Sequence, residues 1–355
     1  MVKNLERVEI LTIEDLPFLK GFMEDILVKE FLPFTLVFDT KTGLLLQKLE
    51  KTVVNKVQES YKDGNFLATI HYSKARGKLN DFLDFFKPRA KNVSGKEVLG
   101  IGMGWGQDLN AVKELGAHVT GCDPNPCSSQ IGEECGFDVV NDYFDPSLFD
   151  EKFDIVLCNE VLEHVDDPID FLSNVKEVIK PEGLIFIKVP DCITQLRAGD
   201  PGMLSHKHTI YYTPNSLRKN LNVSGFGKCK IISAHHDNGL FAVGQVSDTI
   251  LDLKKIDELP LVKKYGKLFQ DFYESMQSRI NRSKNHIGLI GCTRTTIYLL
   301  HKLNWGDSEV TVFETDDGKV GKMIFVDKHL VQHQEKLFTE INPDEAWITP
   351  IGYIT

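Results

Sequence analysis

The stretch Val98-Leu99-Gly100-Ile101-Gly102-Met103-Gly104-Trp105-Gly106-Gln107-Asp108 decides the fold of this chain. An apolar run leads into alternating glycines, and the apolar spacing of residues 109–115 then predicts a helix. Glycines suit such a loop because they accept a positive φ and let the backbone approach a ligand without a Cβ atom. The stretch therefore predicts a strand, a tight loop and a helix N-terminus that bind a nucleoside-bearing cofactor.

The composition excludes several classes of protein. Acidic residues outnumber basic ones, 51 to 41, so the formal net charge is −10 and no nucleic-acid partner is expected. A chain of 355 residues with 42% hydrophobic residues predicts two or three domains with buried cores. It has no apolar run long enough for a membrane span and no signal-peptide core. The seven cysteines form no CxxC pair, which is typical of reduced thiols in a cytoplasmic protein without a metal site.

From Glu97 onward, apolar strands alternate with helices. This alternation predicts an α/β fold in which a parallel sheet lies between helices. The runs 230–234 and 240–244 are joined by a segment that contains Asn238-Gly239, a strong signal for an antiparallel hairpin at the end of the sheet. The expected elements are strands that end at Ile101, Asp123, Val140, Cys158 and Val189, and a helix over 169–179.

Two further regions flank this pattern. The apolar runs 34–38 and 43–47 predict a hairpin, and helices are expected over 49–61 and 79–86, the second ended by Pro88. An apolar stripe predicts a connecting helix over 261–282, after which 287–313 and a third strand at 347–349 predict a smaller βαβ unit. The expected domains are 1–60, 61–250, 251–284 and 285–355, and the end of the chain at Thr355 leaves truncation of the last one open.

The glycine spacing distinguishes between cofactors. A dinucleotide fold requires G-x-G-x-x-G and an acid about 20 residues later, and Asp123 is well placed as that acid, within reach of both ribose hydroxyls. The glycines, however, lie at 102, 104 and 106, and Gln107 occupies the place of the third dinucleotide glycine. A loop without that helix-packing glycine favours a cofactor with an amino-acid tail over a pyrophosphate.

Four ordered motifs in residues 60–250 resemble those of class I S-adenosylmethionine-dependent methyltransferases. They are Glu97–Gly106, Gly121–Asp123, Phe153–Val165 (FDIVLCNEVLEHV) and Lys180–Gly183. The resemblance implies a doubly wound, seven-stranded, Rossmann-like sheet and S-adenosylmethionine as the cofactor. The implied contacts are Gly102, Met103, Gly104 and Gly106 at the methionine end, Asp123 with Pro124 at the ribose, Asp142 and Tyr143 at the adenine, and Asn159 and Glu160 beside the methionine.

One position departs from that family. Where the family usually has Asp, this chain has Gly100. Either cofactor binding is weaker, or another acid such as Glu160 compensates.

The whole chain also resembles three-part sugar methyltransferases, which include C-methyltransferases of nucleotide-linked deoxysugars. Their N-terminal element usually holds zinc through cysteines; this chain has none before Cys122, so that zinc is expected to be lost. Residues 206–213 (HKHTIYYT) resemble their substrate-facing motif H-E-H-x-x-Y-F-T, with Lys207 in place of the Glu. That replacement makes O-methylation the easier proposal over C-methylation and leaves N-methylation open.

Methyl transfer to oxygen needs a base near neutral pH, and histidine suits it. We expect His208 to be the general base, with His206 and Lys207 assisting it or binding an anionic group of the substrate. The alternative is that the histidines only hold their loop by hydrogen bonds. His164, which follows Glu163 after the fourth strand, is the rival base, and Asp191 is a further substrate-side candidate.

The leading hypothesis is a cytoplasmic S-adenosylmethionine-dependent methyltransferase of carbohydrate biosynthesis, acting on a nucleotide-linked or phosphorylated sugar. It has no nucleic-acid or membrane partner, and its oligomeric state is left open. One alternative is a methyltransferase-like protein that binds without catalysis. The other is an NAD-linked oxidoreductase, for which Gly288-x-x-Gly291 near Arg294 offers a second, imperfect loop.

Overall fold

The computed structural model groups the chain into two compact units. The sheet unit contains Tyr61–Asp191 and Thr209–Ile256, and the flanking unit contains Met1–Ser60, Cys192–His208 and Asp257–Thr355. The structure describes residues 7–19, 26–62, 72–235, 238–247, 257–282, 286–314, 323–326, 329–332 and 343–348.

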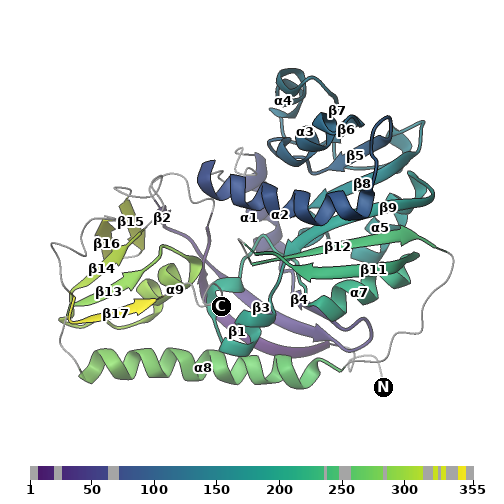
Figure 1. The fold of residues 1–355 in the computed structure, drawn as a ribbon. Helices are drawn as coiled ribbons and strands as arrows, with labels where there is room; N and C mark the ends of the chain where they lie inside the picture. The colour runs from purple at the N-terminus through teal and green to yellow at the C-terminus, as the bar shows by residue number, and fades with distance from the viewer. Residues whose placement is uncertain are drawn as a thin grey trace. The chain divides into compact units, whose positions relative to one another are not determined.

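The sheet unit is built on one seven-stranded sheet with the order β11-β12-β9-β8-β5-β6-β7. Its strands are β5 (Glu97–Ile101), β6 (His118–Cys122), β7 (Asp138–Val140), β8 (Phe153–Asn159), β9 (Ile179–Pro190), β11 (Phe226–Ser233) and β12 (Gly239–Val246). The first five run parallel, whereas β12 pairs antiparallel with β9 and β11. The α/β fold and the terminal hairpin expected from the sequence are therefore confirmed (Figure 1). Residues 236 and 237 of the hairpin connection lie outside the described residues.

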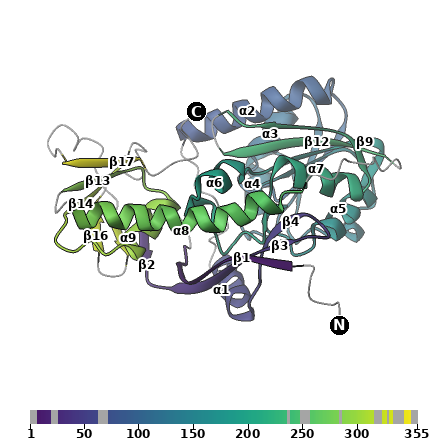
Figure 2. The ribbon, with the colours of Figure 1, turned by 90° about the horizontal axis from the view of Figure 1, so that it is seen from below.

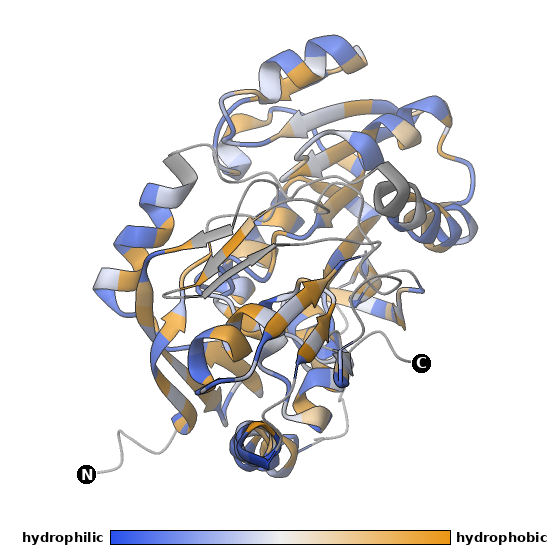
Figure 3. Ribbon diagram, turned by 90° about the vertical axis from the view of Figure 1, so that its left-hand side faces the viewer, coloured by the Kyte–Doolittle hydropathy of each residue, from blue (hydrophilic) through white to orange (hydrophobic). Residues whose placement is uncertain are grey.

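Helices cover both faces of this sheet, with α2 and α3 on one face and α5 and α7 on the other (Figure 2). Phe85 of α2 stacks on Phe241 of β12 at 5.4 Å and meets Phe186 of β9 edge-on at 6.0 Å, so an aromatic cluster fixes α2 to the sheet. Orange segments run along many of the strands in Figure 3, which marks these strands as apolar. The remaining elements of the unit are α2 (Tyr72–Ala90), α3 (Gln107–Glu114), α4 (Ser128–Cys135), η1 (Pro146–Leu148), α5 (Pro168–Glu177), β10 (Ile210–Tyr211) and α7 (Pro214–Val223).

Two boundaries in this unit differ from the sequence prediction. Helix α2 passes Pro88 and ends at Ala90. Pro88 lies in the last turn of the helix, where Lys91 N–H still donates to the carbonyl of Lys87 at 3.1 Å. Helix α5 ends at Glu177, and Ile179, which was expected to end that helix, begins β9 instead. Ile179 changes assignment because it pairs with Phe153 of β8.

The flanking unit contains three small sheets. Strands β1, β3 and β4 are antiparallel, β14-β13-β17 are parallel, and β15 pairs with β16 and β2. The predicted hairpin is confirmed as β3 and β4, the connecting helix as α8, and the smaller βαβ unit as β13, α9 and β14 with β17 as the third strand. The bounds are β1 (Arg7–Pro17), β2 (Ile26–Val28), β3 (Phe31–Asp39), β4 (Leu44–Gln47), α1 (Lys51–Lys62), α6 (Ile193–Ala198), η2 (Pro201–Met203), α8 (Leu259–Arg282), β13 (Ile287–Ile290), α9 (Arg294–Lys302), β14 (Val310–Phe313), β15 (Met323–Val326), β16 (His329–Gln332) and β17 (Glu345–Ile348).

The grouping into units differs from the four expected ranges. Residues 1–60 and 285–355 share one unit with α8 and with 192–208, a segment that the sequence assigns to the sheet domain. Asp200 shows why: it accepts a hydrogen bond from Thr295 Oγ1 at 2.6 Å, and its backbone carbonyl accepts one from Tyr265 Oη at 3.2 Å. Residues 349–355, which bear on the question of a truncated last domain, lie outside the described residues. Among the described helices, none combines the length and apolarity that a membrane span requires.

Candidate active site

The strand order reverses between β5 and β8, because the chain adds β6 and β7 on one side of β5 and then β8 and β9 on the other. Strand β5 pairs with β6 on one side and with β8 on the other. The connection that follows β5 leads toward β6, whereas the connection that follows β8 leads toward β9, in the opposite direction. Ligands of open α/β sheets bind in the crevice at such a switch point. The glycine loop follows β5 there, and Asn159 and Glu160 lie at the end of β8.

The glycine loop adopts a backbone that only glycine accepts easily. Gly102, Gly104 and Gly106 have φ values of 65°, 52° and 69°. A Cβ atom on Gly102 would lie 2.2 Å from Val161 Cγ2, so this glycine is required for packing. A Cβ atom on Gly104 would meet no atom of the described residues within 4 Å. The loop thus presents bare backbone to open space at Gly104.

Asp123 connects this loop to the end of β6. It is buried, and its Oδ2 accepts a hydrogen bond from the Gly104 N–H at 2.9 Å, while its Oδ1 accepts one from the Asn125 N–H at 2.9 Å. Pro124 lies between these two residues. Each carboxylate oxygen keeps a second lone pair, so Asp123 can hold the loop and still accept a ribose hydroxyl.

The end of β7 adds a polar support that the sequence did not reveal. Asn141 Nδ2 donates to the backbone carbonyls of Asp123 at 2.8 Å and Asn125 at 2.7 Å. The next residue, Asp142, accepts the N–H of Tyr143 at 2.7 Å, and the ring of Tyr143 is 69% exposed. Both predicted adenine-side residues therefore lie at the carboxyl end of the sheet.

The side chain of Met103 packs in the core, between the glycines of the loop in sequence. Its thioether packs over Gly121, where an added Cβ atom would approach Met103 Sδ to 2.3 Å. The side chain contributes to the core that also contains Phe137. Only the backbone of Met103 therefore remains to serve the loop.

Glu160 adopts a strained backbone at the end of β8, with a φ of 58°. Its N–H donates to the carbonyl of Lys188 at 2.7 Å, and its carboxylate pairs with Lys188 Nζ at 3.2 Å and Lys78 Nζ at 3.7 Å. Burial raises the pKa of Glu160, but the two ammonium groups outweigh that effect and lower this pKa to about 2. Lys188 could have been noticed as the one charged residue of the apolar run 184–189.

Asn159 forms a hydrogen bond with Asp108, a second residue that the sequence did not indicate. Asn159 Nδ2 donates to Asp108 Oδ2, in the first turn of α3, at 2.7 Å. Burial raises the pKa of Asp108, and the amide offsets part of that rise. Asn159 Oδ1 is buried and has no hydrogen-bond partner among the described residues.

His206 and His208 belong to the flanking unit. The ring of His206 is 4% exposed, packs against Phe18 and Phe34, and has Nε2 3.3 Å from the carbonyl of Leu32. Burial lowers the pKa of His206 to about 4. These contacts favour the alternative that His206 holds its loop.

The backbone around His208 is fixed by local hydrogen bonds. The His208 N–H donates to the carbonyl of Ser205 at 3.1 Å. The amide of Gln47, oriented so that both its groups are satisfied, donates to the carbonyls of His208 at 2.9 Å and His206 at 3.2 Å. His208 itself is 8% exposed.

The aromatic part of the 206–213 motif serves folding. Tyr211 and Tyr212 are buried, and Asn220 Nδ2 donates to Tyr212 Oη at 3.1 Å. Thr213 caps α7 and forms a capping box with Ser216. The spacing of Tyr-Tyr-Thr therefore has a packing and capping explanation.

His164 and Asp191 lie in the sheet unit with the glycine loop. His164 is half-buried, with Nε2 3.8 Å from Glu163 Oε1. The Asp191 N–H donates to the backbone carbonyl of Asn238 at 2.9 Å, and Asn238 Nδ2 donates to the carbonyl of Asp191 at 2.6 Å. Asp191 Oδ2 accepts a hydrogen bond from Ser233 Oγ at 3.4 Å. Asp191 thus anchors the end of β9 to the terminal hairpin, whereas His164 stands on the loop that follows Glu160.

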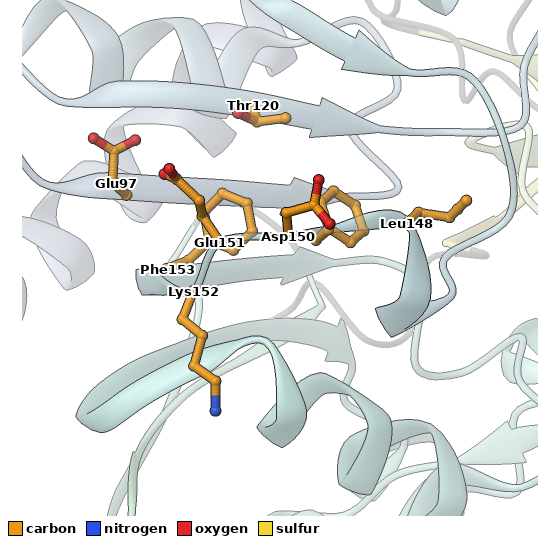
Figure 4. Close-up of a pocket in the computed structure, with 8 residues that line it drawn as sticks. Glu97, Thr120, Leu148, Asp150, Glu151, Lys152 and Phe153 are labelled. Carbon is orange, nitrogen blue, oxygen red and sulfur yellow. The ribbon is translucent and has the colours of Figure 1, made fainter.

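A pocket of the sheet unit lies elsewhere. Glu97 and Phe153, which begin β5 and β8, line it together with Thr120 and residues 148–152, as Figure 4 shows. It is at the amino ends of the strands, opposite to the glycine loop. This pocket therefore does not belong to the candidate site.

Comparisons with known proteins agree with this geometry. A family model described as a methyltransferase domain matches residues 71–229. A ubiquinone biosynthesis O-methyltransferase of Actinobacillus pleuropneumoniae is 35% identical over 118 residues, which cover 29% of this chain and 50% of that protein. The chain thus spans about half the length of that relative. The enzyme of the same name from Glaesserella parasuis is 33% identical over 187 residues, 44% of this chain and 76% of the relative.

Solved structures of methyltransferases are also similar to this chain. The 1,6-didemethyltoxoflavin-N1-methyltransferase of Burkholderia thailandensis, solved with S-adenosylhomocysteine, has a TM-score of 0.42 and 16% identity, and it covers 58% of this chain and 96% of its own.

S-adenosylmethionine is the cofactor that this family uses, and the residues present fit it. Gly104 leaves open space beside its backbone, and Asp123 is an acceptor next to that glycine. Asn159 Oδ1 is a buried acceptor without a protein partner among the described residues. The match covers 76% of the Glaesserella parasuis relative at 33% identity. The chain belongs to the class I S-adenosylmethionine-dependent methyltransferases.

Proposed function

We propose that this protein transfers the methyl group of S-adenosylmethionine to a hydroxyl group of a small molecule. The bond between Gly104 and Asp123 carries the proposal, because it preforms a glycine loop with an acid at the sheet switch point. The curated relatives named O-methyltransferases support oxygen as the acceptor atom. Lys207, which stands where the resembling C-methyltransferases have Glu, supports the same choice.

The reaction needs one proton acceptor from the chain. The bound cofactor supplies a methyl group activated by a positive sulfur. As the acceptor oxygen forms its bond to that methyl carbon, the carbon–sulfur bond breaks and the hydroxyl proton passes to a base. We propose His208 as that base and His164 as the alternative, which stands on the loop that also carries Glu160.

The acceptor that we propose is a nucleotide-linked or phosphorylated sugar. The resemblance of residues 206–213 to the substrate-facing motif of sugar methyltransferases supports it. The names of the curated relatives point instead to ubiquinone biosynthesis, so an acceptor of that pathway is the second candidate.

Mass spectrometry of product mixtures tests the function. The full chain is incubated with S-adenosylmethionine and two panels of acceptors, sugar nucleotides or sugar phosphates in one and ubiquinone precursors in the other. We expect one acceptor to gain a single methyl group while S-adenosylhomocysteine accumulates. Binding of S-adenosylmethionine without a product in either panel would favour the binding protein without catalysis.

A further inference from the structure

The small parallel sheet of the flanking unit has a reversal of strand order of its own. Strand β13 pairs in parallel with β14 on one side and with β17 on the other. The chain runs from β13 through α9 to β14 and adds β17 later, on the opposite side of β13 (Figure 1). Open parallel sheets bind ligands at the carboxyl ends of the strands where the order reverses. The carboxyl end of β13 is therefore a second switch point.

The loop after β13 is built like the glycine loop after β5. Gly291 has a φ of 92°, and its N–H donates to the carbonyl of Phe313, the last residue of β14, at 2.7 Å. In the sheet unit, Gly102 has a φ of 65°, and its N–H donates to the carbonyl of Cys122, the last residue of β6, at 2.8 Å. The same backbone bond thus ties each loop to the end of the second strand.

Glu314 occupies the place that Asp123 holds in the sheet unit. It directly follows β14, is 5% exposed, and accepts the N–H of Cys292 with its Oε2 at 2.9 Å. Asp123 directly follows β6, is 8% exposed, and accepts the N–H of Gly104 at 2.9 Å. An acid at this place accepts ribose hydroxyls in Rossmann-type folds. A carboxylate can accept about four hydrogen bonds, so Glu314 can support its loop and also bind a vicinal diol.

The first turn of α9 is unsuited to a phosphate group. The N–H of Thr296 donates to Thr293 Oγ1 at 3.3 Å, within the capping box of this helix. Thr295 Oγ1 donates to Asp200 Oδ1 at 2.6 Å, which places a buried carboxyl group beside the turn. A phosphate at a helix N-terminus depends on such donors, and here residues of the chain use them. The loop therefore suits a nucleoside whose 5′ position carries no phosphate.

We propose that the loop after β13 and Glu314 bind the ribose of a ribonucleoside that carries no 5′-phosphate. Glu314 accepts the 2′- and 3′-hydroxyl groups, and the backbone at Gly291 and Cys292 lies against the sugar. Because one carboxylate holds both hydroxyls, the site prefers ribonucleosides to their 2′-deoxy analogues. This site is separate from the cofactor loop after β5 and does not depend on the proposed methyl transfer.

Equilibrium dialysis of the full chain tests the proposal. The probes are adenosine, guanosine, cytidine and uridine, at concentrations up to about 1 mM. All proteins carry Asp123→Ala, so that the loop after β5 does not contribute. Glu314→Gln is added to remove the charge while an amide oxygen still accepts the Cys292 N–H. Glu309→Gln is the matched control, because Glu309 is exposed and precedes the same strand, β14, at its other end.

We expect one of the four ribonucleosides to bind, and Glu314→Gln to weaken it at least about tenfold, the effect of losing one hydrogen bond to a charged group. Glu309→Gln should stay within about twofold of the protein that carries Asp123→Ala alone. The 2′-deoxy analogue should bind at least about tenfold more weakly to the protein that keeps Glu314, which tests the site even if Glu314→Gln does not fold. The 5′-monophosphate should bind no more tightly than the nucleoside.

Three results would overturn the proposal. They are the failure of all four ribonucleosides to bind, equal binding by the proteins with Glu314 and with Glu314→Gln, and tighter binding of the 5′-monophosphate than of the nucleoside.

Discussion

Asp123 Oδ2 accepts a hydrogen bond from the Gly104 N–H at 2.9 Å, across 19 positions of the chain. The bond joins the end of β6 to the loop after β5. It fixes the one loop glycine whose Cβ position faces open space, as judged from the described residues. The acid at the end of β6 thus fixes the shape of the glycine loop after β5.

Replacing three glycines by alanine, one at a time, should separate effects on folding stability from effects on cofactor binding. Gly95, Gly102 and Gly104 all have a positive φ, which costs an alanine roughly 1–2 kcal/mol. Gly95→Ala should show that cost alone, because its Cβ atom meets no described atom within 4 Å. Gly104→Ala should cost the same stability but lose S-adenosylhomocysteine binding. Gly102→Ala should cost more, because its Cβ atom collides with Val161. Urea unfolding and calorimetry measure the two effects; equal binding by Gly95→Ala and Gly104→Ala would contradict the assignment.

Glu160 should make stability depend on acid pH. Its folded pKa is about 2, below the ordinary 4.5, so its contribution is complete above pH 4.5 and is lost as the pH falls from about 4.5 to about 2. Glu160→Gln should be less stable at neutral pH, because Lys188 loses a partner at 3.2 Å. The difference between the unfolding free energies of the two proteins should shrink over that window. The measurements run from about pH 6 to about pH 3, which is about 1.5 pH units on either side of the ordinary pKa. If the difference in unfolding free energy stays constant over this range, the pairing of Glu160 with the lysines is ruled out.

His206 should make the folding stability depend on pH in a higher range than Glu160 does. Its pKa is about 4 in the folded chain against 6.5 ordinarily, so the unfolded chain takes up the proton first. Stability should therefore fall as the pH drops from about 6.5 to about 4, by roughly 3 kcal/mol at most. His206→Phe should remove that slope and keep methyl transfer. Unchanged slope in the variant would show that another group is responsible.

The two candidate bases should respond differently to substitution. His208→Ala should lower kcat by about a hundredfold or more if His208 takes the proton, since general-base catalysis contributes about that much. His164→Ala should then keep most of its activity, and both variants should bind S-adenosylhomocysteine normally. Single-turnover measurements with saturating cofactor compare them. The reverse order of the two rates would assign the base to His164.

The sequence predicts the sheet of this protein well because its signals are local. The apolar strands, the glycine loop and the Asn-Gly turn are each read within about a dozen residues. The end of α5 was misplaced because Ile179 continues an apolar pattern that suits either a helix or a strand, and only its pairing with Phe153 decides.

The polar contacts of the site could not be predicted because they are long-range. Asp108 and Asn159 are 51 positions apart, and Asp200 and Thr295 are 95 apart. Residue type and periodicity show which face a side chain occupies but not which partner it meets. The sequence therefore indicated Glu160 as a compensating acid, and only the positions of Lys78 and Lys188 showed that its charge is taken.

We propose that the loop held by Asp123 binds S-adenosylmethionine. Calorimetric titration of the full chain with S-adenosylmethionine, beside Asp123→Ala and with NAD as the competing ligand, tests it most directly. We expect one site per chain for S-adenosylmethionine, loss of that binding in Asp123→Ala, and no comparable heat with NAD. Preferential binding of NAD, or binding of S-adenosylmethionine that survives in Asp123→Ala, would contradict it.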